Sequence, residues 1–376
     1  MTGRALPPSL TSARRLVVKI GSALVVDTEK ALPRQEWLNS VAADIAQLHR
    51  QGTAVTVVSS GAIALARHSL GMTGRTLQLA EKQAAAAVGQ ISLAQAWSKA
   101  LHAHGLTAAQ LLLTPGDTED RKRYLNARAT LDTLIKLNCV PVINENDTVA
   151  TAEIRFGDND RLAARVAQMI DADQLVLLSD IDGLYTADPR LDPTAQHLPV
   201  IDALTPEIEA MGGEPPPGYS SGGMRTKLLA ADIATRSGCA MAIAKGQPLH
   251  PLRALLEGAR CSWFLPRTCS QAARKQWIAG SLTPAGKIIV DRGAVAALQQ
   301  GSSLLPAGIT QVEGQFSRGD LVSVTDEAGL LLAHGLSFYD AEAIRRIAGH
   351  HSSEVEKILG WQHHDEIIHR DNLVMV

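Results

Sequence analysis

The chain has 376 residues, of which 45% are hydrophobic and only 3% aromatic, and its formal net charge is −2. This length exceeds the usual size of one domain, about 100–200 residues, and predicts two domains. The near-neutral charge and the scarcity of aromatic rings argue against a surface that binds single-stranded nucleic acid. The four cysteines form no CxxC pair, which favours free thiols in a reducing compartment.

The N-terminal region carries arginines but no apolar run before a cleavage site, so we expect no signal peptide. No window approaches the roughly 18 apolar residues that a membrane helix needs. We therefore expect a cytoplasmic protein with no membrane partner.

Short apolar runs alternate with longer helical patterns up to about residue 265. In chain order, the expected elements are strand 15–20, helix 35–50, strand 53–59, helices 62–70 and 78–104, strand 106–113, helix 121–137, strand 139–143, helix 161–170, strand 174–179, helix 224–237 and strand 239–244. Strands of nearly continuous Val, Ile and Leu that alternate with helices indicate an α/β fold, with a mainly parallel sheet sandwiched by helices.

The pattern changes in the last part of the chain. Residues 266–285 mix prolines with polar residues, and we expect a linker there. Shorter strands broken by glycines follow at 287–290, 311–312, 321–324 and 330–333. The sequence therefore predicts an α/β domain over 1–265 and a small β-rich domain over 286–376.

Lys19 ends the first apolar strand and is followed by Gly21 and Ser22. A buried ammonium without a partner is costly, so a buried Lys19 needs an anion close by. The alternative is a lysine that extends from the strand end into water. The glycine favours a functional site, because a ligand can approach the backbone closely there.

The segment SSGGMRTK contains a second lysine that could bind phosphate. Gly222 and Gly223 precede an alanine-rich helix, whose first N–H groups would face a bound anion. Lys227, about one turn further, would reach a terminal phosphate. The spacing is not that of a Walker A loop, and a tight turn with a solvated lysine explains the same residues.

The segment 143–160 is the richest in amides and carboxylates. Such oxygens suit magnesium or calcium, although the spacing does not match an EF-hand. The group could instead bind an amino acid, with Asp147 pairing with its ammonium and Asn159 donating to its carboxylate. In parallel sheets, ligands bind beyond the carboxyl ends of the strands, where Lys19, Ser60 and Asp180 are also expected.

Two histidine doublets, 350–351 and 363–364, raise the question of a metal site in the second domain. Neighbours on a chain usually point apart, so we do not expect one. The arginines at 345 and 346 fit a solvated helix face better than a basic patch.

The motifs VVKIGS, SSGAIA, EKQAAAAVGQ, LNARATL, PVINENDTVATAEIRFGDND, GLYTADPR and GGMRTK occur in order over residues 15–230. Together they resemble the glutamate 5-kinase branch of the amino-acid kinase family. The tail motifs GSSLLPAGI, FSRGD and RRIAGHH resemble the PUA domain that many bacterial members carry. The resemblance implies the amino-acid kinase fold and, with Mg²⁺, transfer of the γ-phosphoryl group of ATP to the side-chain carboxylate of glutamate. The product would be glutamate 5-phosphate, in the first step of proline biosynthesis.

By motif position, the resemblance also implies a role for individual residues. Lys19 and Lys227 would stabilise the transferred phosphoryl group, and Asp160 would orient them. The residues that would hold glutamate are Ser60, Asn144, Asp147, Asp158 and Asn159. The residues that would contact the nucleotide are Lys19, Ser179, Asp180, Ser221, Gly222, Gly223, Met224, Arg225, Thr226 and Lys227. No residue is implied as a direct metal ligand.

Serine departs from the family pattern at two of these positions, Ser179 and Ser221, where threonine is common. The hydroxyl group is kept and only a methyl group is lost. We expect at most a modest effect on nucleotide affinity.

The resemblance further implies a homodimer or homotetramer, feedback inhibition by proline, and hand-over of the product to glutamate-5-phosphate reductase. Two alternatives stay open at the level of sequence. One is a sibling kinase that acts on another carboxylate, and the other is an RNA-associated PUA protein. RNA binding is the less expected, because acidic residues offset the arginines and lysines of the tail.

Overall fold

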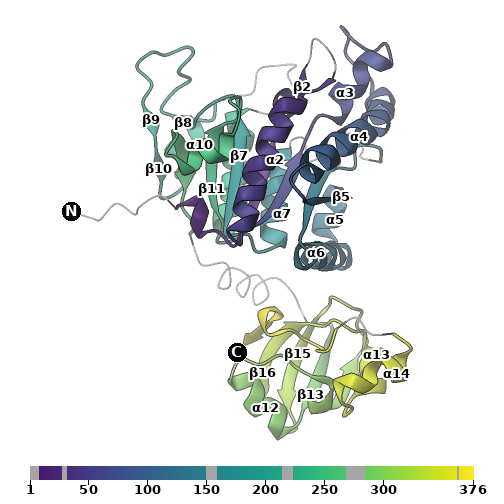
Figure 1. The fold of residues 1–376 in the computed structure, drawn as a ribbon. Helices are drawn as coiled ribbons and strands as arrows, with labels where there is room; N and C mark the ends of the chain where they lie inside the picture. Colours follow the sequence, from purple (N-terminus) through teal and green to yellow (C-terminus); the bar gives the residue numbers. More distant parts are fainter. Residues whose placement is uncertain (1–7, 28–31, 150–158, 214–222, 268–283, 362–363) are drawn as a thin grey trace, which may run out of the picture. The chain divides into compact units, whose positions relative to one another are not determined.

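The computed structural model describes residues 8–27, 32–149, 159–213, 223–267, 284–361 and 364–376. The chain divides into two compact units, Met1–Cys269 and Ser270–Val376 (Figure 1). The division falls within the linker expected at 266–285, most of which lies outside the described residues. The exact domain bounds, 1–265 and 286–376, stay a prediction. No helix in the described ranges is long and apolar enough to cross a bilayer.

The described part of the first unit is built on an eight-stranded sheet with the order β10-β12-β11-β7-β1-β4-β6-β5. All neighbours are parallel except β11 and β12. The strands are β1 (Arg15–Ile20), β4 (Ala54–Ser59), β5 (Thr107–Leu113), β6 (Cys139–Glu145), β7 (Gln174–Ser179), β10 (Val200–Ile201), β11 (Ala240–Lys245) and β12 (Cys261–Phe264). The predicted α/β class with a mainly parallel sheet is therefore confirmed.

Helices cover both faces of this sheet, as Figure 1 shows with α2 in front and α7 behind. One face packs on α2 (Gln35–Arg50) and α4 (Leu79–His102), and the other on α6 (Arg121–Lys136), α7 (Asn159–Met169) and α9 (Met224–Arg236). Shorter helices are α1 (Ser22–Val25), α3 (Ala62–Ser69), α5 (Pro115–Glu119), α8 (Pro206–Ala210) and α10 (Pro251–Leu256). The two helical layers create two separate apolar cores.

The alternation of side chains along β1 decides which core each residue joins. Leu16, Val18 and Ile20 belong to the core beside α2 and α4, whereas Val17 belongs to the core beside α7 and α9. Lys19 alternates with Val18 and Ile20, so its side chain lies on the face that α7 and α9 cover. Charged residues of these two helices can therefore contact Lys19 at the carboxyl end of β1.

A glycine sets the close approach of α4 to the start of α3. A Cβ atom at Gly89 would lie 1.8 Å from the carbonyl oxygen of Ala62, so no larger residue fits without moving a helix. Ala62 begins α3 directly after Ser60 and Gly61. The middle of α4 is thereby held against the segment that leaves β4.

The second unit is a small β-rich domain. Its described sheet has the order β14-β13-β15-β16-β17, with β13 (Gly286–Val290), β14 (Ile309–Gly314), β15 (Leu321–Asp326), β16 (Leu331–Leu336) and β17 (Leu373–Met375). Its helices are α12 (Arg292–Gln299), α13 (Ala341–Ile347) and α14 (Val355–Leu359). Ile288 and Val322 in its strands and Ile344 in α13 are fully buried in its core.

Short elements account for most of the differences from prediction. The sequence did not indicate β10, β12, β17, or the two-stranded pairs β2 (Val26–Asp27) with β3 (Leu32–Pro33) and β8 (Leu184–Tyr185) with β9 (His197–Leu198). Helix α7 begins at Asn159, two residues before the predicted start at Arg161. Strand β6 continues to Glu145, beyond the predicted end at Ile143.

Candidate active site

The centre of the site is one buried carboxyl group held between two lysines. The Nζ atom of Lys19 lies 2.5 Å from Oδ1 of Asp160, and the Nζ atom of Lys227 lies 2.9 Å from Oδ2. Asp160 is 0% exposed and each lysine is 6% exposed. Two ammonium groups and one carboxylate leave a net positive charge in a buried place, which is an arrangement suited to an anion.

Three separate elements bring these groups together. Lys19 is next to last in β1, Asp160 is the second residue of α7, and Lys227 lies in the first turns of α9. Helices α7 and α9 pack on the same face of the sheet, which is the face that Lys19 enters. The convergence of the two lysines, predicted from sequence, is thus observed, while their catalytic role stays a proposal.

A row of amides crosses the carboxyl edge of the sheet beside this centre. The Nδ2 atom of Asn159 donates to Oδ1 of Asn144 at 2.9 Å and to Oγ of Ser60 at 2.6 Å. The Nδ2 atom of Asn144 in turn donates to Oε1 of Gln90 at 2.9 Å. Three residues expected to hold glutamate are therefore in direct contact, and Gln90 joins them.

Gln90 is the member of this row that the sequence did not single out. Asn144 alternates with Val140 and Val142, which pack in the core beside α4, so it points toward the helix that carries Gln90. The motif EKQAAAAVGQ contained this glutamine, but a glutamine on a helix is usually solvated.

Of the other two predicted glutamate ligands, the described residues include Asp147 but not Asp158. Asp147 lies half-buried in the turn that follows β6, three residues after Asn144. Asp158 lies outside the described residues, immediately before the start of α7.

The predicted nucleotide residues lie at two places on the same edge of the sheet. Ser179 is buried at the end of β7, and its hydroxyl group donates to Oδ1 of the exposed Asp180 at 3.0 Å. Gly223 is the residue before α9, and its carbonyl oxygen accepts from Oγ1 of Thr226 at 2.8 Å. Ser221 and Gly222 lie outside the described residues, whereas Met224 and Arg225 begin the helix.

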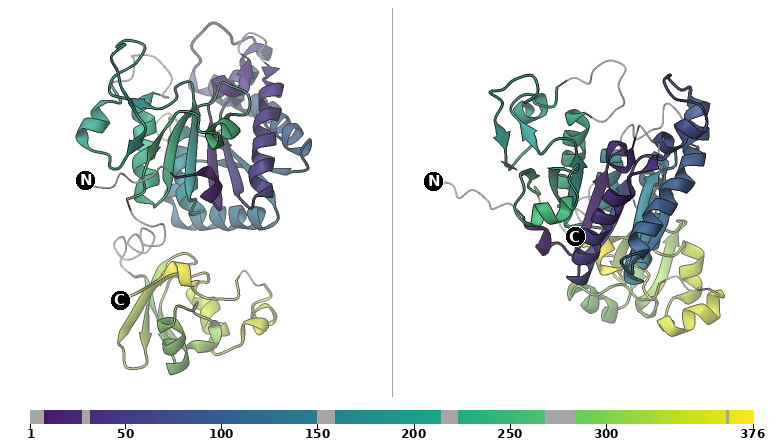
Figure 2. Two further views of the ribbon diagram at one scale, coloured as in Figure 1. Left: turned by 60° about the vertical axis from the view of Figure 1, so that its left-hand side comes forward. Right: turned by 45° about the horizontal axis from the view of Figure 1, so that its top comes forward.

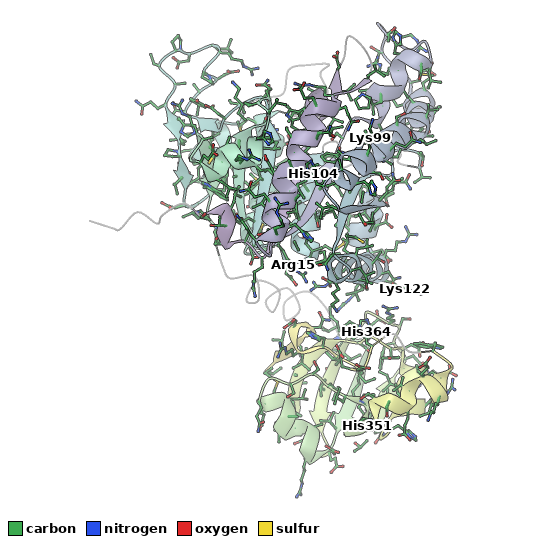
Figure 3. All side chains as sticks on the ribbon, in the orientation of Figure 1. Arg15, Lys99, His104, Lys122, His351 and His364 are labelled. Atoms are coloured by element: carbon green, nitrogen blue, oxygen red, sulfur yellow. The ribbon has the colours of Figure 1, made fainter. Side chains whose placement is uncertain are left out.

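The direction of the strands shows why these groups share one edge. Arg15, labelled in Figure 3, marks the amino end of β1, and the site residues follow the opposite, carboxyl end. The right-hand view of Figure 2 turns that edge toward the reader. Strands β1 and β7 are neighbours, yet the chain leaves β1 toward β4 on the other side. This is the kind of switch point at which α/β sheets bind ligands.

The described residues of the site offer few protein ligands for Mg²⁺. Among the described residues, no group of three or more His, Cys, Asp or Glu side chains could hold a metal ion. Mg²⁺ in phosphotransferases usually takes one or two carboxylates and completes its shell with water and substrate phosphates. The exposed Asp180 fits this pattern, so the site suits a magnesium ion that arrives with a nucleotide.

The described histidines of the two doublets make local contacts within the second unit. His351 and His364 lie at different places on this unit in Figure 3, and His363 is outside the described residues. His351 Nδ1 lies 2.9 Å from Oγ of Ser353, within its own turn. The ring of His364 stacks on Phe338 at a centroid distance of 3.9 Å, so His351 and His364 both make local contacts.

Family models and sequence relatives place the chain among the kinases. The chain matches the model of the "Amino acid kinase family" over residues 14–245 and that of the "PUA domain" over residues 286–359. A glutamate 5-kinase of Gluconobacter oxydans (strain 621H) is 63% identical over 375 residues, which cover 100% of this chain and 99% of that protein. One of Paramagnetospirillum magneticum (strain ATCC 700264 / AMB-1) is 60% identical over 366 residues, covering 97% and 99%.

The chain belongs to the glutamate 5-kinases of the amino acid kinase family. A solved structure of UMP kinase from Ureaplasma parvum shares 16% identity with it and superposes with a TM-score of 0.46, covering 67% of this chain and 98% of that protein. The assignment depends on the family model and the sequence relatives, which span nearly the whole chain.

Proposed function

We propose that this site transfers the γ-phosphoryl group of ATP to the side-chain carboxylate of L-glutamate and forms glutamate 5-phosphate, the first step of proline biosynthesis. The observation that carries the proposal is the pair of buried ammonium groups on the single carboxylate of Asp160. Kinases of this kind work by positioning their substrates and by neutralising charge.

The nucleophile needs no general base. A glutamate side chain has a pKa of about 4.3 and is already an anion at neutral pH. The obstacle is repulsion between this carboxylate and the phosphate oxygens. Lys19 and Lys227 offset that repulsion, and Asp160 keeps both ammonium groups in place before the substrate arrives. Mg²⁺ supplies further positive charge when it is bound with ATP.

Binding of glutamate is assigned to the row of polar groups beside this centre. Ser60, Asn144 and Asn159 form one hydrogen-bonded set, and Asp147 stands in the turn after β6. Ser179, Asp180 and the start of α9 are assigned to the nucleotide, together with Ser221 and Gly222, because they lie on the same edge of the sheet or follow the family motif. Asp158 is assigned to glutamate on the motif alone.

The substrate assignment is tested by following ATP consumption with glutamate, aspartate and acetylglutamate in parallel. We expect turnover with glutamate and only weak turnover with the other two. Faster turnover with aspartate or acetylglutamate would make the enzyme a sibling kinase and would overturn the proposal.

Replacing Asp147 by alanine is expected to raise the KM for glutamate by about 10- to 100-fold, because a charged hydrogen bond to the substrate ammonium contributes about 1.5–3 kcal/mol. The kcat at saturating glutamate should change little. A glutamate titration of the initial rate measures both values. Asp202→Ala, at an exposed carboxylate after β10, is the matched control. An unchanged titration of Asp147→Ala would make this aspartate merely structural.

Family membership also supports inferences about regulation and assembly. We infer that proline inhibits the enzyme by competing at or near the glutamate site, and that the chain forms a homodimer or homotetramer in the cytoplasm. Hand-over of the labile acyl phosphate to glutamate-5-phosphate reductase is the expected next step. RNA binding is not favoured, and a gel-shift titration over salt would detect it as a steep loss of affinity.

A further inference from the structure

Gln90 occupies a fixed place next to the proposed glutamate site. It follows Gly89, which lets α4 pack directly on Ala62 at the start of α3. Its side chain is half-buried, and its Oε1 atom accepts the hydrogen bond from Asn144 at 2.9 Å. The helix thereby places an amide at one end of the row formed by Ser60, Asn159 and Asn144. A substrate in contact with Asn159 and Ser60 need not touch Gln90.

The hydrogen bonds of this row have one direction. An amide nitrogen carries two hydrogens, and both hydrogens of Asn159 Nδ2 are used, one by Asn144 and one by Ser60. Asn159 therefore has only its carbonyl oxygen left, which can accept but cannot donate. Ser60 accepts from Asn159, so its own O–H group remains available to donate.

The direction of the row depends on the group at its end. Each amide could be turned end for end, and turning one would force its neighbours to turn as well. With Gln90 presenting oxygen, Asn144 must present Nδ2 to it and Oδ1 to Asn159. If all three side-chain amides were turned, Asn159 would present an N–H donor to the substrate, and not a carbonyl acceptor.

We propose that Gln90 is a positioning residue for glutamate, which acts through Asn144 to keep the Asn159 carbonyl oxygen and the Ser60 hydroxyl group facing the substrate. The carbonyl oxygen accepts from the substrate ammonium, and the hydroxyl group donates to its α-carboxylate. This differs from the sequence-based expectation that Asn159 donates to the carboxylate. The inference rests on the proposed function and concerns only its amino-acid subsite.

The first test is Gln90→Met, which keeps the length of the side chain and removes its acceptor. We expect the KM for glutamate to rise about tenfold, because a buried amide of Asn144 loses its partner. The kcat and the KM for ATP should stay within about twofold, because the lysine centre is unaffected. Gln95→Met, at an exposed glutamine on the same helix, is the control and should change neither constant. An unchanged KM for glutamate in Gln90→Met overturns the proposal.

The second test separates direction from packing. A glutamate at position 90 can accept but cannot donate, so Gln90→Glu should keep the KM for glutamate within about threefold of the wild type at an ionic strength of about 0.15 M, which screens the added charge. A KM as high as that of Gln90→Met would show that the row runs in the other direction and would overturn the proposal.

The third test is a double-mutant cycle with Asn144→Ala. If Gln90 acts only through Asn144, Gln90→Met should add less than about twofold to the KM of Asn144→Ala. Multiplication of the two single effects would overturn this route. Absence of glutamate turnover in the wild-type enzyme would instead refute the proposed function, so the two failures are distinguishable.

Discussion

Replacing Lys227 by methionine is expected to lower kcat by about 10²- to 10³-fold, which is the usual loss when one charge-stabilising donor is removed from a transition state. The methionine keeps most of the apolar stem of this buried side chain. Asp160 still has Lys19 as a partner, at 2.5 Å, so no carboxylate is left unpaired. The KM for glutamate should stay nearly constant, because the proposed contact of Lys227 is with the phosphoryl group and not with the amino acid.

Steady-state kinetics with both substrates varied will measure this effect. Arg236→Met is the matched control, since Arg236 is a cation in the last turn of the same helix with a side chain that is 67% exposed. It should leave kcat unchanged. A higher Michaelis constant with unchanged kcat in Lys227→Met would assign Lys227 to ground-state binding and would contradict the proposed catalytic role.

Much of the kinase fold could be predicted because parallel strands buried on both faces appear as continuous apolar runs. Strands β1 and β7 begin and end at the predicted residues, as does helix α2. The short strands β10 and β12 gave no such signal. They have only two and four residues, and their pairing with distant strands is a tertiary property that no local pattern carries.

The start of α7 could not be predicted from local sequence, because its first residues are polar. Asn159 and Asp160 are polar residues at the place where a loop was expected, yet both are buried within the helix. Their burial is possible because Asn144, Ser60 and the two lysines satisfy them. A polar residue that is compensated from other parts of the chain cannot be distinguished from a loop residue by local sequence alone.

The residues of the candidate site differ in how clearly the sequence indicates them. Lys19 was informative because a lysine at the end of an apolar strand is anomalous by itself. The role of Asp160 came from the family motif, since one aspartate among several in that segment has no distinguishing pattern. The contact between Gln90 and Asn144 could not be predicted, because it depends on the close packing of α4 on Ala62 and on the side of β6 that Asn144 faces.

Replacing Asp160 by asparagine is expected to separate stability from nucleotide affinity. The change removes a fully buried charge that faces two ammonium groups, and breaking such a pair typically costs about 3–5 kcal/mol of the free energy of unfolding. The kcat should fall about 10²-fold, because the lysines lose the group that fixes their positions. The KM for ATP should not rise, because the site becomes more positive and a polyanion binds it at least as well.

Denaturant unfolding, steady-state kinetics and the rise in melting temperature on adding MgATP together test this prediction. Asp232→Asn is the matched control, because Asp232 also lies between two cations, Arg236 and Arg267, each at 2.9 Å, but near the surface of the molecule. Surface pairs contribute about 0–1 kcal/mol, so this control should unfold almost like the wild type and keep its kcat.

A higher KM for ATP in Asp160→Asn, together with the lower stability, would contradict the prediction. It would show that Asp160 serves only the packing of α7. We expect MgATP to raise the melting temperature of Asp160→Asn at least as much as that of the wild type. The reason is that phosphate oxygens then take the place of the missing carboxylate charge between Lys19 and Lys227.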